Sequence, residues 1–107
     1  MQALVNFVIA LPSEAKPLIN RLGLRQDSSR PDVRLYTRNQ YRLLVSGIGK
    51  AASATAVRTI VGSEPSDTHH IWLNVGIAGH AHLPKGAPGI AHLITDATTG
   101  VSFCPSI

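Results

Sequence analysis

Residues 4 to 10 read Leu-Val-Asn-Phe-Val-Ile-Ala, and Leu11-Pro12-Ser13-Glu14 follows at once. A near-continuous apolar run of this length is typical of a β-strand covered on both faces, the environment of a parallel sheet. Ser13 is a candidate N-cap and Glu14 suits a first helical turn, so we expect a helix that stops at Gly23. These two elements predict the start of an α/β domain.

The rest of the chain continues the alternation of strands and helices. We expect a hairpin of two short strands at Val33 to Thr37 and Tyr41 to Val45, and then an alanine-rich helix at Ala51 to Val61. Two further strands are expected at Ile71 to Val75 and Gly89 to Thr95. Residues 25–32 are polar and are expected to form a loop, and residues after 95 are expected to be irregular. The order predicts an α/β fold with a mixed β-sheet flanked by helices, in one domain over residues 1–107. No helix follows the last strand, so we expect the sheet to be incomplete.

The composition is that of a globular domain. The chain has 107 residues, of which 44% are hydrophobic and 15% charged. No apolar run approaches the roughly 20 residues of a membrane-spanning helix, and no basic segment precedes the first apolar run as in a signal peptide. The single cysteine, Cys104, excludes an internal disulfide framework and fits a reducing compartment. We therefore expect a cytoplasmic domain with no membrane partner.

The formal net charge is +4, and six of the ten cations are arginines between Arg21 and Arg42. This cluster could mark a nucleic-acid patch, but it equally suits a solvated face or anchors for small anions. Only two aromatic residues, Tyr36 and Tyr41, lie among the arginines. Charge alone therefore does not favour nucleic acid as a partner.

Three segments join a predicted strand to a loop or helix through small residues. They are Ala10-Leu11-Pro12-Ser13-Glu14, Ser46-Gly47-Ile48-Gly49-Lys50 and Asn74-Val75-Gly76-Ile77-Ala78-Gly79. Ligands of open α/β sheets bind at the carboxyl ends of strands, where glycine lets the backbone approach closely. The second segment is also similar to a dinucleotide fingerprint, but the acid expected about 20 residues later would fall in a loop.

In their order and spacing, these segments resemble the purine and uridine phosphorylase superfamily, most closely its methylthioadenosine/adenosylhomocysteine nucleosidases. The matching motifs continue with Tyr36-Thr37, Leu83-Pro84-Lys85-Gly86 and Ala91-His92-Leu93-Ile94-Thr95-Asp96. The resemblance covers nearly the whole chain but only the first half of a family domain. It implies the N-terminal half of a nucleoside phosphorylase-like fold, and action on the N-glycosidic bond of a purine nucleoside.

The resemblance also implies a role for individual residues. Glu14 would be the water-activating base, Ala10 and Leu11 would line the sugar or water site, and Ile48 would touch the 5′ substituent. The backbone of Gly76, Ile77, Ala78 and Gly79 would approach the base and ribose. Phosphorylases of this type tend to have arginine at the position of Glu14, and a carboxylate repels phosphate. Hydrolysis is therefore favoured over phosphorolysis.

Two departures from the family pattern bear on activity. Ile77 stands where the nucleosidases usually have serine, which puts methylthioadenosine as substrate in question. The family's leaving-group acid lies in the second half of its domain, so activity of this chain is expected to be impaired. No cofactor is implied.

Other interpretations of the same residues stay open. Glu14 could simply stabilise the N-terminal end of a helix. The chain could be a non-catalytic fragment that binds a nucleoside or a partner chain, and an unfinished sheet edge predicts a homo-oligomer. His80, His82 and His92 could hold a metal, but no acid or cysteine lies at ligand spacing, so we predict no metal site.

Overall fold

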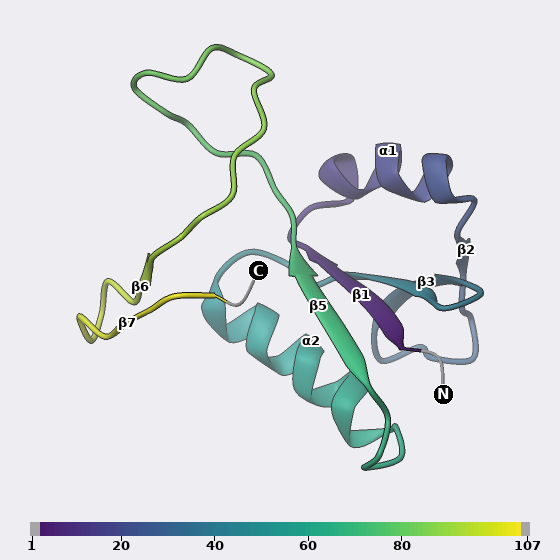
Figure 1. The fold of residues 1–107 in the computed structure, drawn as a ribbon. Coiled ribbons are helices and arrows are strands. Elements are labelled where there is room, and N and C mark those ends of the chain that lie inside the picture. The colour runs from purple at the N-terminus through teal and green to yellow at the C-terminus, as the bar shows by residue number, and fades with distance from the viewer. Residues whose placement is uncertain (1–2, 106–107) are drawn as a thin grey trace.

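Strand β1 (Leu4–Ile9) lies between two parallel neighbours in the computed structural model, which describes residues 3–105 (Figure 1). The five-stranded sheet has the order β2-β3-β4-β1-β5. The other strands are β2 (Arg25–Gln26), β3 (Arg34–Arg38), β4 (Tyr41–Val45) and β5 (His70–Asn74). Strands β4 and β5 run parallel to β1, whereas β2, β3 and β4 are joined antiparallel. The predicted α/β class with a mixed sheet is confirmed.

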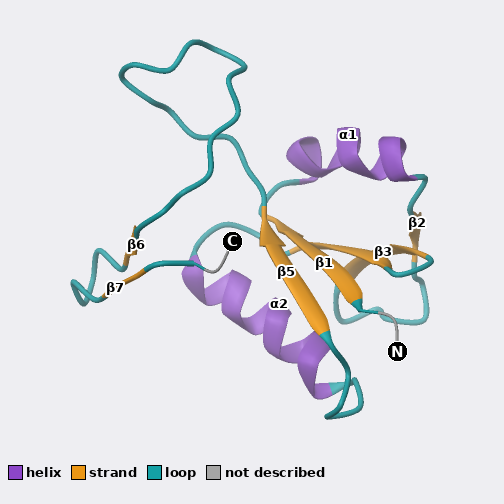
Figure 2. Cartoon of the chain, viewed as in Figure 1, coloured by secondary structure: helices purple, strands orange, loops and turns teal. Residues whose placement is uncertain are grey.

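Helices cover the two faces of this sheet, with α1 (Pro12–Leu22) on one face and α2 (Lys50–Gly62) on the other (Figure 2). Side chains alternate between the faces along a strand, so the neighbours Leu43 and Leu44 of β4 enter different cores. Leu43 packs with Ala15 of α1, and Leu44 packs with Ile60 of α2. All four side chains are fully buried or nearly so.

The predicted N-cap at Ser13 is wrong. It would start the helix at Glu14, whereas α1 begins two residues earlier, at Pro12. The N-cap is Leu11, which is extended, and Pro12 occupies the first turn. A proline favours an extended residue before it and carries a fixed helical φ, so it starts a helix well. The predicted stop at Gly23 is confirmed, because Gly23 adopts a left-handed conformation with φ of 64° and caps the helix.

The central strands and α2 lie within one residue of their predicted bounds. The predicted hairpin forms, and Asn39 in its turn has a positive φ, which asparagine tolerates better than most residues. The loop prediction is wrong for Arg25 and Gln26, because these residues extend the sheet by pairing with β3. Helix α2 includes Gly62 and is capped by Ser63.

The C-terminal segment departs most from prediction, because a continuous strand over 89–95 does not form. Only β6 (Ile94–Thr95) is extended, and it pairs antiparallel with β7 (Ser102–Phe103), in a region expected to be irregular. This hairpin is separate from the five-stranded sheet, and a long loop connects it to β5 (Figure 1). A strand needs a neighbour for its backbone groups, and residues 89–93 have none in the described structure.

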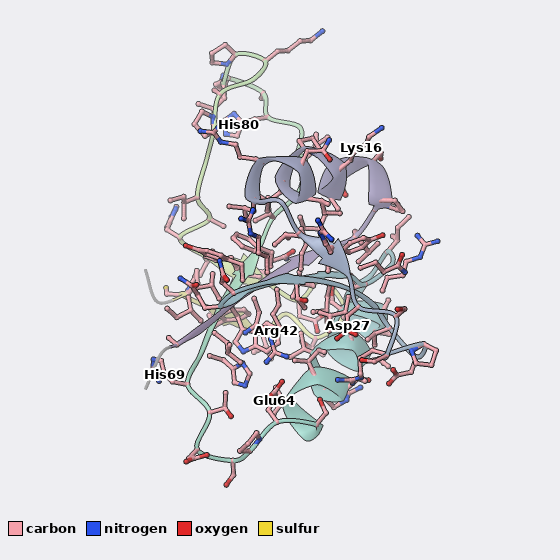
Figure 3. The ribbon with its side chains drawn as sticks, turned by 90° about the vertical axis from the view of Figure 1, so that its right-hand side faces the viewer. Lys16, Asp27, Arg42, Glu64, His69 and His80 are labelled. Carbon is pink, nitrogen blue, oxygen red and sulfur yellow. The ribbon has the colours of Figure 1, made fainter. Side chains whose placement is uncertain are left out.

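A polar group lies on the α2 face of the sheet. Asn6 of β1 is fully buried, and its Nδ2 lies 3.0 Å from Nδ1 of His70. Arg42, beside Asn6 on β4, pairs with Glu64 in the loop after α2 (Figure 3). This ion pair is mostly shielded from solvent and fastens the C-terminal end of α2 to the sheet. Within the described residues, no helix is long and apolar enough to cross a membrane.

The central strand supplies a test of the core. We expect Leu43→Ala to lower the free energy of unfolding by about 2–5 kcal/mol, because it removes a fully buried side chain and leaves a cavity. Leu83→Ala, in the exposed loop after β5, should change it by less than about 0.5 kcal/mol. Urea unfolding followed by Trp72 fluorescence measures both, and equal effects would contradict the assigned core.

Candidate functional site

The carboxyl ends of β1, β4 and β5 meet at one edge of the sheet, because the three strands are parallel. Backbone hydrogen bonds carry this pairing past the strands. The Gly47 N–H donates to the carbonyl of Ala10 over 3.1 Å, and the Val75 N–H donates to the carbonyl of Val8 over 3.1 Å. The three segments that the sequence singled out therefore converge, as open α/β sheets require of a ligand site.

A groove of about 720 Å³ opens at this edge on the side of α2. Residues from all three segments line it together with one face of α2: Ala10, Gly47, Gly49, Lys50, Ser53, Ala54, Val57, Arg58 and Asn74. The lining contains two cations and no carboxylate. The volume suits a small organic molecule, since ligand pockets typically span about 300–1,000 Å³.

Two glycines shape the turn between β4 and α2. Gly47 has φ of 90° and Gly49 has φ of 97° with ψ of 163°, a region that is essentially restricted to glycine. No side chain caps the start of α2, so its first backbone N–H groups have no side-chain partner. The turn thus presents bare backbone at the end of the groove.

Glu14 joins the first segment to the third. It lies in the first turn of α1, and its Oε2 accepts a hydrogen bond from the Ile77 N–H over 2.9 Å. A Cβ added at Gly76 would lie 3.4 Å from this same oxygen, in van der Waals contact, so Gly76 is a direct neighbour of the carboxylate. Oε1 accepts no hydrogen bond from residues 3–105.

The other predicted site residues are distributed unevenly. Ala10 lines the groove, and Leu11 is the N-cap of α1 and is 39% exposed. Ile48 and Ile77 are 77% and 86% exposed and lie outside the groove lining. The groove lining also excludes Ala78 and Gly79, which follow Ile77 in the exposed loop. The structure thus gathers Glu14, Gly76 and Ile77 in one place, outside the groove lining, whereas Ala10 lies in the groove.

Several groove residues were not among the predicted site residues. The face of α2 contributes Ser53, Val57 and Arg58, and β5 contributes Asn74. Residues 50, 53, 54, 57 and 58 recur at helical spacing, so one face of the predicted helix already carried this signal. A helix that follows a strand-end turn in an α/β sheet presents its first turns to the ligand edge.

Lys50 links the groove to the C-terminal hairpin. Its Nζ lies 2.9 Å from both Oδ1 and Oδ2 of Asp96, which directly follows β6. The Lys50 ammonium lowers the pKa of Asp96 below its ordinary value, and the backbone N–H of Thr98 adds to this effect. The charged form of Asp96 is therefore the form that the folded chain favours.

His80 and His82, two of the three histidines considered as possible metal ligands, form part of a turn. Nδ1 of His80 accepts hydrogen bonds from the N–H groups of His82 and Leu83, each over 3.0 Å. The His80 and His82 rings contact edge to face. Within residues 3–105, no group of three or more histidine, cysteine, aspartate or glutamate side chains is placed to hold a metal ion.

Comparison with known proteins does not identify the chain: no family model, no curated protein and no solved structure matches it.

The turn before α2 gives a matched pair of glycine substitutions. We expect Gly49→Ala to lower the free energy of unfolding by about 1–3 kcal/mol, because alanine is strained at this φ and ψ. Gly79→Ala should leave it nearly unchanged, because a Cβ at Gly79 meets no atom within 4 Å and its φ is not positive. Thermal unfolding compares the two, and a larger loss in Gly79→Ala would refute the turn geometry.

The Lys50–Asp96 pair has a measurable pH signature. Because the pKa of Asp96 is lowered, the pair contributes stability above the ordinary aspartate pKa, and this is lost as pH falls through the lowered value. In Lys50→Gln, an NMR titration should show the pKa of Asp96 rising toward its ordinary value. The pKa of Asp27, lowered by Ser29, is the internal control and should not move.

Proposed function

We propose that the chain is a nucleosidase-like protein that binds a purine nucleoside at the carboxyl edge of its sheet and hydrolyses the N-glycosidic bond. The observation that carries the proposal is the hydrogen bond from the Ile77 N–H to Glu14, since it brings the candidate base to the third strand-end segment. The groove that Ala10, Gly47 and Asn74 line lies at the same edge of the sheet and is open to solvent, and Glu14 is not part of its lining.

The geometry around Glu14 suits the activation of water. One carboxylate oxygen is fixed by the Ile77 N–H, which leaves Oε1 to accept a proton from a water molecule. Gly76 lies beside the carboxylate, and a Cβ there would come into van der Waals contact with Oε2 at 3.4 Å. Water that gives a proton to Oε1 would attack the anomeric carbon of a sugar held along the 76–79 backbone. The C–N glycosidic bond would break, and the leaving purine nitrogen would take a proton from solvent.

Hydrolysis is favoured over phosphorolysis for an electrostatic reason. A phosphate brought to the anomeric carbon beside Glu14 would face a carboxylate, and residues 73–76 offer no arginine to offset it. The two cations of the groove, Lys50 and Arg58, line a surface that does not include Glu14, so they do not offset this repulsion. Neutral water meets no such repulsion.

Turnover is expected to be low, because among the described residues no acid lines the groove to protonate the leaving purine. Asp96 is the last acid in the sequence, and its two carboxylate oxygens are taken up by Lys50. General acid catalysis typically contributes about 10²–10⁴-fold.

We place the activity in the cytoplasm, because the exposed free thiol of Cys104 suits a reducing compartment.

Substitution of Glu14 tests the proposal. Glu14→Gln keeps an oxygen that can accept the Ile77 N–H but removes the base, so release of adenine from methylthioadenosine or adenosine should fall by about 10²–10⁴-fold. Chromatography of the released base measures the rate, and unfolding curves should match the wild type.

Asp67→Asn is the matched control, because Asp67 is an exposed acid in the loop before β5, whereas the site follows the other end of that strand. It should retain wild-type activity. Equal rates in wild type and Glu14→Gln would remove Glu14 from the chemistry and leave it as a structural link between α1 and the Ile77 loop.

A second proposal, self-association, is favoured by the exposed apolar row on β5. Ile71 and Leu73 are 45% and 43% exposed, on the last strand at one edge of the sheet. An edge strand with free backbone groups and apolar side chains is suited to pair with another chain. We propose that two copies associate through β5, and that a nucleoside-binding role without turnover is compatible with this assembly.

Leu73→Lys should weaken this association. A charge in the apolar row opposes burial, so the sedimentation coefficient at a given concentration should fall toward that of a monomer. Leu83→Lys, at a similarly exposed leucine in the loop, should leave it unchanged. A wild-type chain that stays monomeric at high concentration would exclude the assembly.

A further inference from the structure

Residues 76–105 form an arm that has few polar ties to the rest of the chain. The residues from Gly76 to Cys104 are exposed, except for Asp96, which is partly buried. Among the described residues, only two side-chain hydrogen bonds or ion pairs connect this arm to the sheet and helices. These are the hydrogen bond from Ile77 to Glu14 and the ion pair of Asp96 with Lys50.

The Asp96 end of the arm is preorganised for its contact. The Asp96 N–H donates to the carbonyl of Val101 over 2.8 Å, and the Gly100 N–H donates to the carbonyl of Asp96 over 2.7 Å. The Thr98 N–H holds Oδ1 at 2.9 Å. The turn between β6 and β7 therefore presents both carboxylate oxygens to Lys50 together.

Lys50 is also part of the groove. Its side chain is 65% exposed, so a molecule that enters the groove can reach the ammonium. The second cation of the lining, Arg58, forms no ion pair with the described residues. The carboxylate of Asp96 is thus an oxyanion of the chain itself, bound to a cation that a ligand in the groove would use.

We propose that Asp96 is a latch that holds the arm beside the groove, and that an oxyanion entering the groove competes for Lys50 and releases the arm. The contact is autoinhibitory toward anionic ligands, because such a ligand must displace Asp96. The proposal goes beyond the nucleosidase activity and does not depend on Glu14 acting as a base.

The ion pair between Lys50 and Asp96 is weak enough for another anion to compete with it. An exposed ion pair contributes little to stability, because water and salt screen it. An anion in the groove has both Lys50 and Arg58 in the lining, whereas Asp96 pairs with Lys50 alone, so the anion can compete with Asp96. Release of the pair leaves the hairpin intact, because the hydrogen bonds of β6 with β7 lie within the arm.

The chain carries its own pair of probes for this motion. Trp72 on β5 is the single tryptophan, and the exposed Cys104 on the arm is the single cysteine. An acceptor dye on Cys104 reports the position of the arm through energy transfer from Trp72. The test uses Asp96→Asn, which keeps an oxygen for the Thr98 N–H but loses the charge, with Asp67→Asn as the control.

In Asp96→Asn, the ratio of closed to open arm should fall by about two- to fivefold, the effect of one exposed ion pair, and the transfer efficiency should change accordingly. Asp67→Asn should match the wild type. Replacing chloride with inorganic phosphate at fixed ionic strength should change the wild-type signal in a saturable way. It should have no effect on Asp96→Asn or Lys50→Gln.

Equal transfer in wild type and Asp96→Asn would overturn the latch. A wild-type signal that does not respond to phosphate would overturn the competition, as would an equal response in Lys50→Gln. None of these readings depends on hydrolysis, so their failure is distinct from a failure of the nucleosidase proposal.

Discussion

The parallel pairing of β1 with both β4 and β5 is the constraint on which the rest of the molecule depends. It aligns three carboxyl ends, and the backbone hydrogen bonds at Gly47 and Val75 extend this alignment into the following segments. It also favours cover on both faces of β1 and β4, because parallel strands with apolar residues on either side are stabilised by burial. Helices α1 and α2 provide that cover, and each begins at the edge where the segments meet.

The two carboxylates at this edge have related structural roles. Glu14 holds the start of the arm through the Ile77 N–H, and Asp96 holds its far end through Lys50. Both therefore position a segment that otherwise lies in solvent. The groove lies between the sheet and α2, so the placement of the arm and the access of a ligand are coupled through Lys50.

Apart from the N-cap at Ser13, the sequence predicted what depends on local pattern, and it failed where strand pairing decides. The apolar run of β1, the alanine-rich helix and the Gly23 cap each carry their signal within a few residues, and each is confirmed. The short strand at Arg25 and the hairpin of β6 with β7 depend on partners that no local pattern reveals. For the site, the convergence of three strand ends followed from topology. The ion pair of Lys50 with Asp96 joins residues 46 positions apart, and only the folded chain shows it.

The buried amide of Asn6 has a consequence for how the sheet can assemble. Its side chain faces α2, close to His70 and beside the arginine of the neighbouring strand. Sliding β1 by one position would turn every one of its side chains to the opposite face and bury this amide against Ala15, Leu24 and Leu43, which offer no polar side-chain partner. A single polar residue in an otherwise apolar strand thus lowers the free energy of one register of the sheet relative to the register shifted by one residue.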